Sequence, residues 1–363
     1  SIGADMSIVE GVMGLFDGRS GVGGEGSSAH LAKTLNLHVI LVVSAKGMSG
    51  SLVPLVEGFV ARAKAMGVQI VGIIANHVGS ENHAKLLREL LNNFELPPLV
   101  AWLNKDAPKL PERHLGLKMP NELDLPDFSN HFHVDNTFFT VAKQYNRAIT
   151  NADETTSSLA CLTGELLKNK TIAITKDEAF CFIYPANIAW LEAQGAKVVY
   201  FSPLAGDNVP DHADALWLVG GYPELHLEAL KPSKSLPSIR DFIESDQPVL
   251  AECGGMMILG ESVLTVEARK RELKPASMLG LLPYHFVMQE KLASLGYRED
   301  ARGVRGHEFH HSKRVRKDTA AKAKPAFAVN RGDSGIRYKN LRASYIHWYF
   351  ASQPQEVTSW FTM

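Results

Sequence analysis

Short apolar runs alternate with amphipathic segments along the first half of the chain. The runs have the length of buried strands, and the segments between them carry apolar residues at helical spacing. Such alternation predicts a parallel sheet covered by helices on both faces. The expected strands are 6–9, 39–43, 68–75 and 99–103, and the expected helices are 27–35, 51–66 and 82–92.

The same pattern starts again after a polar stretch at 151–158, which has too few apolar residues to be a core element. Strands are expected at 171–174, 198–201, 216–219 and 248–251. We therefore predict an α/β fold with two parallel-sheet domains. Their predicted bounds are 1–150 and 169–363, joined by a linker at 151–168.

Composition narrows the class of protein. A chain of 363 residues with 45% hydrophobic residues is long enough for two cores. A formal net charge of −1 gives no electrostatic basis for binding nucleic acid or an anionic membrane. No signal peptide or apolar run of membrane-spanning length is visible. The three cysteines are widely spaced and lack zinc-site spacing, which favours the reducing cytoplasm.

Cys253 is the strongest candidate for chemistry. It lies between the apolar run 248–251 and a helical start at 256–259, and Gly254 and Gly255 follow it directly. A tight turn of this kind exposes a nucleophile at a helix N-terminus, where the dipole and free N–H groups favour the thiolate. The alternative is a small buried cysteine beside a glycine turn.

Two further motifs support a catalytic reading. An apolar strand ends at Gly220 and Gly221, with Pro223 at a helix start, and N–H groups released by such a turn can face an oxyanion. A strand-like run at 343–350 carries His347, a residue type that can accept and return a proton. Taken singly, the glycines indicate only a turn and the histidine only a buried strand residue.

In this order the motifs resemble class I glutamine amidotransferase domains. Four segments narrow the resemblance further: AECGGMM at 251–257, GGYPE at 220–224, GHEFH at 306–310 and VEGVMGLFDG at 9–18. Together they resemble the cobyrinic acid a,c-diamide synthase family of cobalamin biosynthesis. This resemblance implies a flavodoxin-like amidotransferase domain joined to an incomplete P-loop NTPase or dethiobiotin-synthetase-like domain.

The resemblance implies a role for each candidate in the second domain. Cys253 would attack the glutamine side-chain amide, and His347 would move the proton. Gly221 and Gly254 would supply the oxyanion N–H groups, and the glutamyl thioester would then be hydrolysed. Members of the wider class carry a glutamate two residues after the histidine, whereas this chain has Tyr349 there. The orienting partner of His347 is therefore unassigned.

For the first domain the resemblance implies a synthetase that uses ATP and Mg²⁺. Glu10 and Asp17 would help to hold magnesium and the tetrapyrrole carboxylate, with Glu10 as the metal ligand. Asn76 resembles the residue that recognises adenine. The alternatives are an ordinary strand-end charge, an Asp-Gly turn and a turn cap. Ser44 stands where family members commonly have aspartate, so a role for that carboxylate is not expected here.

The chain has no Walker A sequence. The nearest match, at 21–28, has serine in place of the phosphate-binding lysine and predicts a loop leading into a serine-capped helix. The sequence also begins with Ser1, just before the family's Val-Glu-Gly segment. We expect a truncated sequence that lacks the first strand–helix unit; supply of that unit by a separate chain is the alternative.

The segment 306–310 contains alternating histidine and glutamate and invites interpretation as a metal site. Strand periodicity places His307 and Phe309 on one face and Glu308 and His310 on the other. The four side chains are thereby divided between the faces, which argues against a shared metal ion.

The resemblance implies glutamine- and ATP-dependent amidation of the a and c acetate groups of cobyrinic or hydrogenobyrinic acid through an acyl phosphate. Cobyric acid synthase and nickel-sirohydrochlorin a,c-diamide synthase share the architecture and stay open as alternatives. A non-enzymatic subunit that binds glutamine or tetrapyrrole is a further alternative. A homodimer is one oligomeric state compatible with the sequence.

Overall fold

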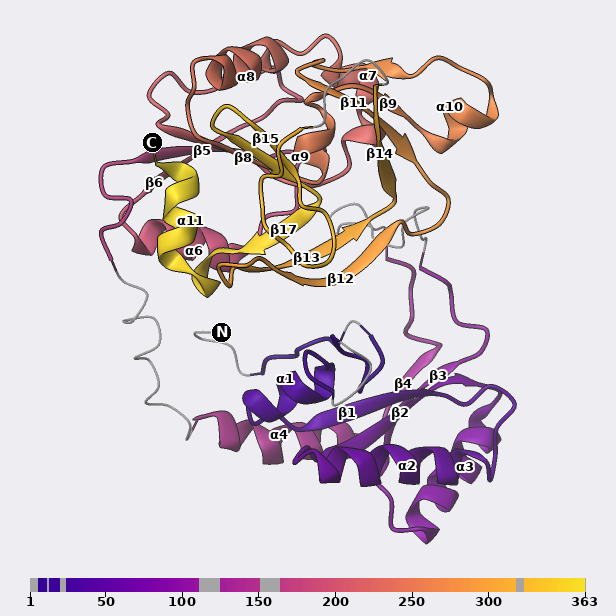
Figure 1. Ribbon diagram of the computed structural model, residues 1–363. Helices are drawn as coiled ribbons and strands as arrows, with labels where there is room; N and C mark the ends of the chain where they lie inside the picture. The colour runs from indigo at the N-terminus through magenta and orange to yellow at the C-terminus, as the bar shows by residue number, and fades with distance from the viewer. Residues whose placement is uncertain are drawn as a thin grey trace. The chain divides into compact units, whose positions relative to one another are not determined.

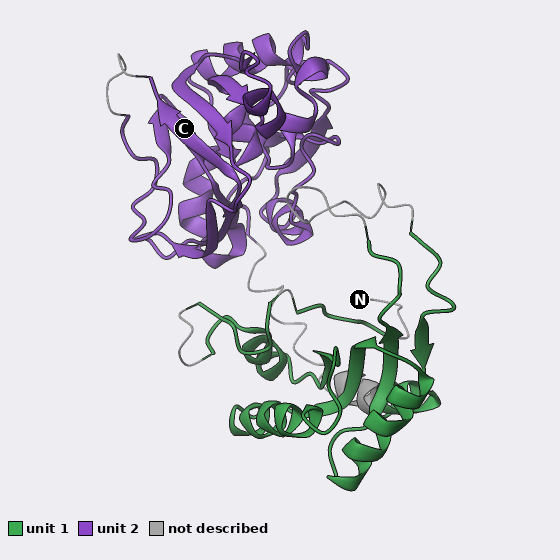
Figure 2. Cartoon of the chain, turned by 90° about the vertical axis from the view of Figure 1, so that its right-hand side faces the viewer, with its two compact units in different colours: residues 1–156 green, residues 157–363 purple. Residues whose placement is uncertain are grey.

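The chain divides into two compact units, Ser1–Thr156 and Ser157–Met363 (Figure 2). The computed structural model describes residues 6–11, 13–19, 24–110, 125–150, 164–317 and 323–362. The predicted linker at 151–168 lies largely outside the described residues, as do Cys161 and residues 21–23 of the loop predicted at 21–28. Within the described part of the chain, no helix has the length and apolar character needed to cross a membrane.

Unit 1 is built on a four-stranded sheet in the order β1-β2-β3-β4. The first three strands are parallel, and β4 runs antiparallel to β3. Figure 1 shows this sheet with its helices in the indigo-to-magenta part of the chain. The elements are α1 (Ser28–Thr34), β1 (Val39–Ser44), α2 (Leu52–Ala65), β2 (Ile70–Val78), α3 (Glu81–Asn93), β3 (Leu99–Asn104), β4 (Phe132–Val134) and α4 (Asn136–Thr150).

Helices cover both faces of this sheet, as the alternating pattern predicts. The larger core combines α1, α2 and α3 with inward residues such as Leu41, Ile73 and Leu99. The smaller one packs Val141 of α4 against Val71 and Val100. Ser27 caps α1 by accepting a hydrogen bond from the His30 N–H, so the predicted serine-capped helix is confirmed.

The predicted buried strand at 6–9 is wrong. Residues 6–11 form no regular structure, and the side chains of Ile8 and Val9 are 78% and 54% exposed. An apolar run forms a strand only where a neighbouring strand supplies hydrogen bonds, and none of the described strands pairs with this segment. Glu10 therefore lies in an exposed irregular segment rather than at the end of a strand.

Unit 2 contains a six-stranded sheet in the order β15-β16-β8-β7-β5-β6, in which all pairs are parallel except β15 with β16. In Figure 1, α8 lies on one side of this sheet, and α6 and α11 lie on the other. The elements are β5 (Thr171–Thr175), α6 (Pro185–Ala193), β6 (Lys197–Phe201), β7 (Ala215–Leu218), η2 (Pro223–Leu225), α7 (Leu227–Leu230), α8 (Ser235–Glu244), β8 (Val249–Glu252), α9 (Gly254–Met257), β15 (Ile336–Tyr338), β16 (Leu341–Ser344), η3 (Phe350–Ser352) and α11 (Pro354–Phe361).

Two smaller sheets flank this core, and the strand pattern did not predict them. One has the order β10-β9-β11-β14, and the other has the antiparallel order β12-β13-β17. The α/β class is confirmed, but the sheets are mixed rather than purely parallel. The additional elements are β9 (Gly260–Leu264), α10 (Val266–Lys270), β10 (Ala276–Ser277), β11 (Leu282–Met288), β12 (Ser294–Glu299), β13 (Arg305–His310), β14 (Ser312–Arg316) and β17 (Ile346–Tyr349).

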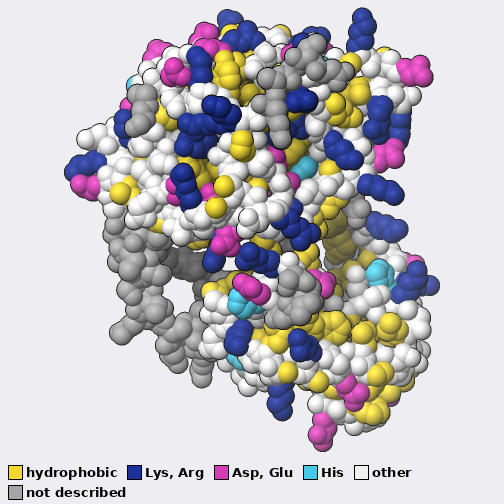
Figure 3. Space-filling model, in the orientation of Figure 1, with side chains coloured by type: hydrophobic (Ala, Val, Ile, Leu, Met, Phe, Trp, Pro, Cys, Tyr) yellow, Lys and Arg dark blue, Asp and Glu magenta, His cyan; other side chains and the backbone are white. Residues whose placement is uncertain are grey.

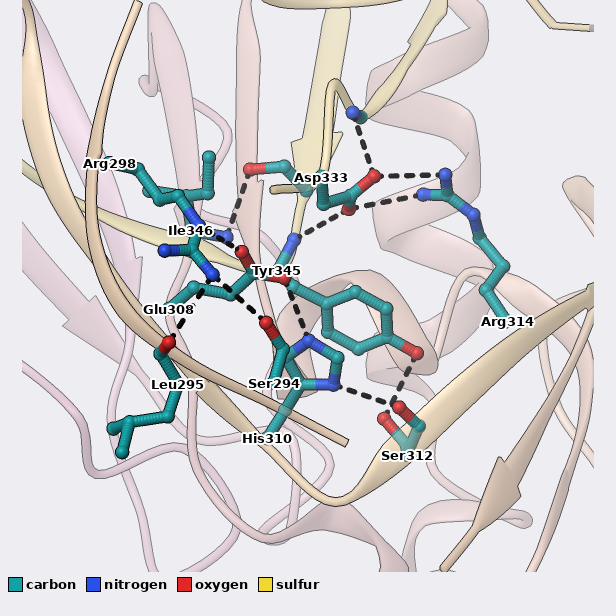
Figure 4. Close-up of polar contacts among 12 residues, drawn as sticks. Ser294, Leu295, Arg298, Glu308, His310, Ser312, Arg314, Asp333, Tyr345 and Ile346 are labelled. Atoms are coloured by element: carbon teal, nitrogen blue, oxygen red, sulfur yellow. Dashed lines mark hydrogen bonds and ion pairs between the residues drawn. The ribbon is translucent and has the colours of Figure 1, made fainter. Parts of the chain in front are cut away.

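The run at 343–350, predicted as one strand, breaks at Tyr345. Its first part, β16, belongs to the six-stranded sheet, and its second part, β17, joins β13 in the three-stranded sheet. Asp333 fixes the break by accepting a hydrogen bond from the Tyr345 N–H at 2.9 Å and an ion pair from Arg314 at 3.0 Å (Figure 4). The break carries the chain, and His347 with it, from one sheet to the next.

A buried ion pair links two strands of the three-stranded sheet (Figure 4). Glu308 on β13 pairs with Arg298 on β12 at 2.5 Å and with His310 at 2.9 Å, and all three side chains are at most 8% exposed. His310 in turn stacks on Tyr345, with ring centroids 3.7 Å apart. Burial opposes ionisation of Glu308, but hydrogen bonds from His310 and Arg298 outweigh it and lower its pKa to about 2.

We expect the Glu308→Gln variant to lose about 3 kcal/mol of stability at neutral pH, because Arg298 is left buried without its counter-charge. The pKa of Glu308 is lower in the folded protein than its ordinary value of 4.5. Its contribution is therefore complete above pH 4.5 and is lost as the pH falls towards 2. Urea unfolding of wild type and variant, followed by tryptophan fluorescence across this range, measures both effects.

The matched control is Glu261→Gln, which breaks the Glu261–Lys317 pair, whose side chains are 30% and 50% exposed. We expect this variant to change stability by less than about 1 kcal/mol. Equal losses in the two variants would contradict the assignment of stability to the buried pair.

Candidate active site

Cys253 occupies a strained turn between β8 and α9. Its backbone has φ 45° and ψ −107°, a left-handed conformation that a non-glycine residue rarely adopts. The Cys253 N–H donates to the Ser344 carbonyl at 2.7 Å, and the Cys253 carbonyl accepts from the N–H groups of Met256 and Met257. The predicted strand–turn–helix around this cysteine is thus confirmed, although α9 is only one turn long.

The glycines named as oxyanion donors lie together at this turn. A Cβ atom on Gly254 would stand 3.0 Å from the Gly221 carbonyl oxygen and 3.1 Å from the Gly221 nitrogen. Gly221 has φ 155°, and a Cβ there would meet the Ala179 carbonyl oxygen at 2.2 Å. Only glycine allows the two backbone segments to approach this closely. The structure therefore brings Gly221 and Gly254 to one place beside Cys253.

Gly220 connects this turn to His347. A Cβ atom on Gly220 would lie 2.3 Å from Cε1 of the His347 ring. The imidazole thus packs directly against the Gly220 backbone, and the rings of Phe182 and Tyr184 lie beside it. The glycine pair accordingly touches the cysteine turn on one side and the histidine on the other.

Glu252 is a further residue of the site, and the motifs do not single it out. It ends β8 directly before Cys253, is 1% exposed, and places its Oε2 atom 3.9 Å from Nδ1 of His347. Its carboxylate accepts hydrogen bonds from the Trp217 indole N–H at 3.2 Å and the Trp348 backbone N–H at 2.9 Å. A charged residue at the end of a wholly apolar strand was the signal that could have revealed it.

Burial sets the protonation states of the resting site. It raises the pKa of Cys253 to about 12, and the nearby Glu224 carboxylate adds to this, whereas a hydrogen bond from Gly254 opposes it. It also lowers the pKa of His347 to about 4 and raises the pKa of Glu252 to about 8. The expectation that the helix N-terminus favours the thiolate is therefore wrong for the resting site, because desolvation outweighs the dipole of a one-turn helix.

The alternation predicted for β13 is confirmed. Glu308 and His310 lie on one face and contact each other, as described above. His307 lies on the other face, directly across from His347 in the antiparallel pair of β13 and β17. A second imidazole thus borders that of His347, and its positive form would disfavour protonation of His347.

The three residues proposed for the synthetase half lie in unit 1. Asp17 is exposed in a loop, and its backbone N–H donates a hydrogen bond to the Gly14 carbonyl. Asn76 is half-buried within β2, in register with Ser44 of β1, and its side chain accepts a hydrogen bond from the His77 N–H. Its expected place after the end of a strand is wrong, because β2 continues to Val78.

The described residues hold no metal site built from protein ligands alone. No group of three or more potential protein ligands from His, Cys, Asp and Glu occurs in the part of the chain that the structure covers. Glu10 and Asp17 are both exposed on irregular segments. Mg²⁺ in nucleotide sites is usually held by one or two carboxylates together with phosphates and waters, so a role for Glu10 or Asp17 beside bound nucleotide stays a prediction.

Comparison with known proteins identifies the family. A CobB/CobQ-like glutamine amidotransferase domain matches residues 171–355, which include the Gly220 turn, Cys253 and His347. The chain is 36% identical to the cobyrinate a,c-diamide synthase of Priestia megaterium, over 98% of this chain and 79% of that protein. The chain belongs to the cobyrinate a,c-diamide synthase family. The resemblance seen in the motifs is thereby confirmed.

Other members of the cobyrinate a,c-diamide synthase family show similar agreement. The enzyme of Herminiimonas arsenicoxydans is 35% identical over 96% of this chain and 77% of its own length. A hydrogenobyrinate a,c-diamide synthase from Brucella anthropi is 35% identical over 95% of this chain and 80% of its own length. Both substrate names thus occur among relatives of equal similarity.

We expect Gly220→Ala to reduce glutamine hydrolysis by roughly 10²-fold, because the new methyl group would displace the His347 ring. The matched control is Gly58→Ala in α2, where a Cβ meets nothing within 4 Å. Glutamate release by the two variants, together with their thermal unfolding, measures the effect. Full activity in folded Gly220→Ala protein would contradict the placement of His347.

Proposed function

We propose that this chain hydrolyses glutamine at Cys253 and uses the ammonia to amidate the a and c acetate groups of cobyrinic or hydrogenobyrinic acid. The observation that carries the proposal is the joint placement of the Cys253 turn, the Gly220–Gly221 turn and His347 in unit 2. Family membership over nearly the whole chain supports the amidation step.

The glutaminase half of the reaction begins from neutral groups. His347, kept neutral by burial, accepts the thiol proton, and the Cys253 sulfur attacks the amide carbon of glutamine. The backbone N–H groups of Gly221 and Gly254 stabilise the oxyanion of the tetrahedral intermediate. The protonated histidine gives its proton to the leaving nitrogen, ammonia departs, and water then hydrolyses the glutamyl thioester.

The synthetase half needs an activated carboxylate, because a carboxylate at neutral pH is a poor electrophile. In this proposal ATP phosphorylates the acetate side chain, and ammonia displaces phosphate from the acyl phosphate to give the amide. Asn76 would contact the adenine, and Glu10 and Asp17 the substrate carboxylate or the nucleotide's metal ion. What supports these three roles is the family motif at 9–18 and the position of Asn76 within the last three residues of β2.

The test incubates the native protein with ATP, Mg²⁺ and cobyrinic acid. Either glutamine or free ammonia is supplied as the nitrogen source. The wild type should form a diamide from both sources and release glutamate only from glutamine. Cys253→Ala should release no glutamate and form diamide only from ammonia. Cys181→Ala, which alters a half-buried cysteine, is the matched control and should behave as wild type.

The products separate the alternative functions. Amidation of other side chains of the corrinoid would indicate cobyric acid synthase, and turnover of nickel-sirohydrochlorin alone would indicate the nickel-dependent branch. Glutamine binding without glutamate release, unchanged in Cys253→Ala, would contradict the proposal and favour a binding subunit. Parallel assays with hydrogenobyrinic acid show which corrinoid the enzyme uses.

A further inference from the structure

The ring of His347 has a buried nitrogen without a hydrogen-bond partner among the described residues. This nitrogen is Nδ1, and the Nε2 atom of the ring is not among the buried, unpaired atoms. A catalytic imidazole must be held in one tautomer, and this is usually done by a hydrogen bond to the nitrogen that faces away from the nucleophile. Tyr349, two residues later, offers no carboxylate and is 46% exposed.

Glu252 stands at the position where such a partner is needed. Its Oε2 atom is 3.9 Å from His347 Nδ1, and both side chains are at most 5% exposed. The Trp348 N–H holds the other oxygen of Glu252, so the carboxylate is fastened to the residue that directly follows the histidine. The Trp217 indole N–H fixes Oε2 from the neighbouring strand β7.

We propose that Glu252, the residue directly before the nucleophile, is the positioning residue that orients His347 and stabilises its protonated form during glutamine hydrolysis. The inference rests on the proposed glutaminase function. Glu252, at the end of β8, would take the role of the glutamate that the wider class carries two residues after the histidine. Cys253, His347 and Glu252 then form a triad in which the nucleophile and the orienting carboxylate are adjacent in sequence.

The chemistry requires only a small movement. A separation of 3.9 Å is too long for a hydrogen bond, but catalytic hydrogen bonds often tighten only when substrate is bound. When the thiol proton moves to Nε2 of His347, the ring becomes positively charged and its Nδ1–H faces Glu252. In a buried site the attraction between these charges is far stronger than in water. The Glu252 carboxylate neither gains nor loses a proton in this step, because it acts only as a counter-charge.

The pH dependence of the reaction follows from the groups around His347. These are Glu252 of β8, Cys253, His307 and His310 of β13, and Tyr184 before α6. Burial raises the pKa of Glu252 to about 8. The carboxylate stabilises an imidazolium only when ionised, so the turnover number should rise as the pH increases through about 8.

The experiment compares Glu252→Gln and Glu252→Asp with wild type in glutamate release across pH. Glu252→Gln should lower kcat by roughly 10²-fold or more, with KM nearly unchanged, and should lose the rise near pH 8. Glu252→Asp, which keeps the charge, should recover part of kcat and keep the rise. The matched control, Glu261→Gln, changes a half-exposed carboxylate of β9 and should leave both properties as in wild type.

A second measurement does not depend on turnover. Nitrogen-15 NMR of the histidine rings, assigned with His347→Gln, should show the Nδ1–H tautomer of His347 in wild type and a changed ring state in Glu252→Gln. An unchanged ring state together with an unchanged pH profile would overturn the role of Glu252. If wild type released no glutamate, the proposed function would fail, and the ring state alone would decide the inference.

Discussion

The left-handed backbone of Cys253 is the constraint on which the site depends. Such a conformation costs roughly 1–3 kcal/mol and persists only where the surroundings enforce it. Here the Ser344 carbonyl receives the Cys253 N–H, and the Gly221 backbone closes against Gly254 with no room for a side chain. The turn ends β8 and brings the candidate oxyanion donors, Gly221 and Gly254, together beside Cys253. Parallel strands β7 and β8, which lie next to each other, supply both turns at the same edge.

The second requirement is to deliver a histidine to that edge from the far end of the chain. The break at Tyr345 does this by transferring the chain from the six-stranded sheet to the three-stranded sheet. Two ion pairs hold the break and the adjacent strand β13: the partly buried pair of Asp333 with Arg314 and the buried pair of Glu308 with Arg298. Exposed Lys and Arg side chains, by contrast, are scattered among acidic ones over the surface drawn in Figure 3. The ion pairs that are shielded from solvent thus lie where they fix the geometry of the site.

Periodicity predicted the regular elements well, since buried parallel strands and amphipathic helices leave strong local patterns. It failed at 6–9, because a run of apolar residues does not reveal whether a neighbouring strand is present to pair with it. It also missed the flanking sheets, whose short strands alternate and carry charges at buried positions, such as Arg298 and Glu308. Cys253, His347, Gly221 and Gly254 could be named from motifs. Glu252 carried only the weaker signal of a charge at the end of an apolar strand. Its contact with His347 joins residues far apart in the chain, so its place in the site is visible only in the structure.

The central claim is that Cys253 is the nucleophile for glutamine, and covalent labelling tests it most directly. A diazoketone analogue of glutamine alkylates only a nucleophile that is activated within a glutamine site. Mass spectrometry of the digested protein should find one adduct, on Cys253, which excess glutamine prevents and which Cys181 and Cys161 do not carry. Labelling of either other cysteine, or an unlabelled Cys253 in folded protein, would contradict the account.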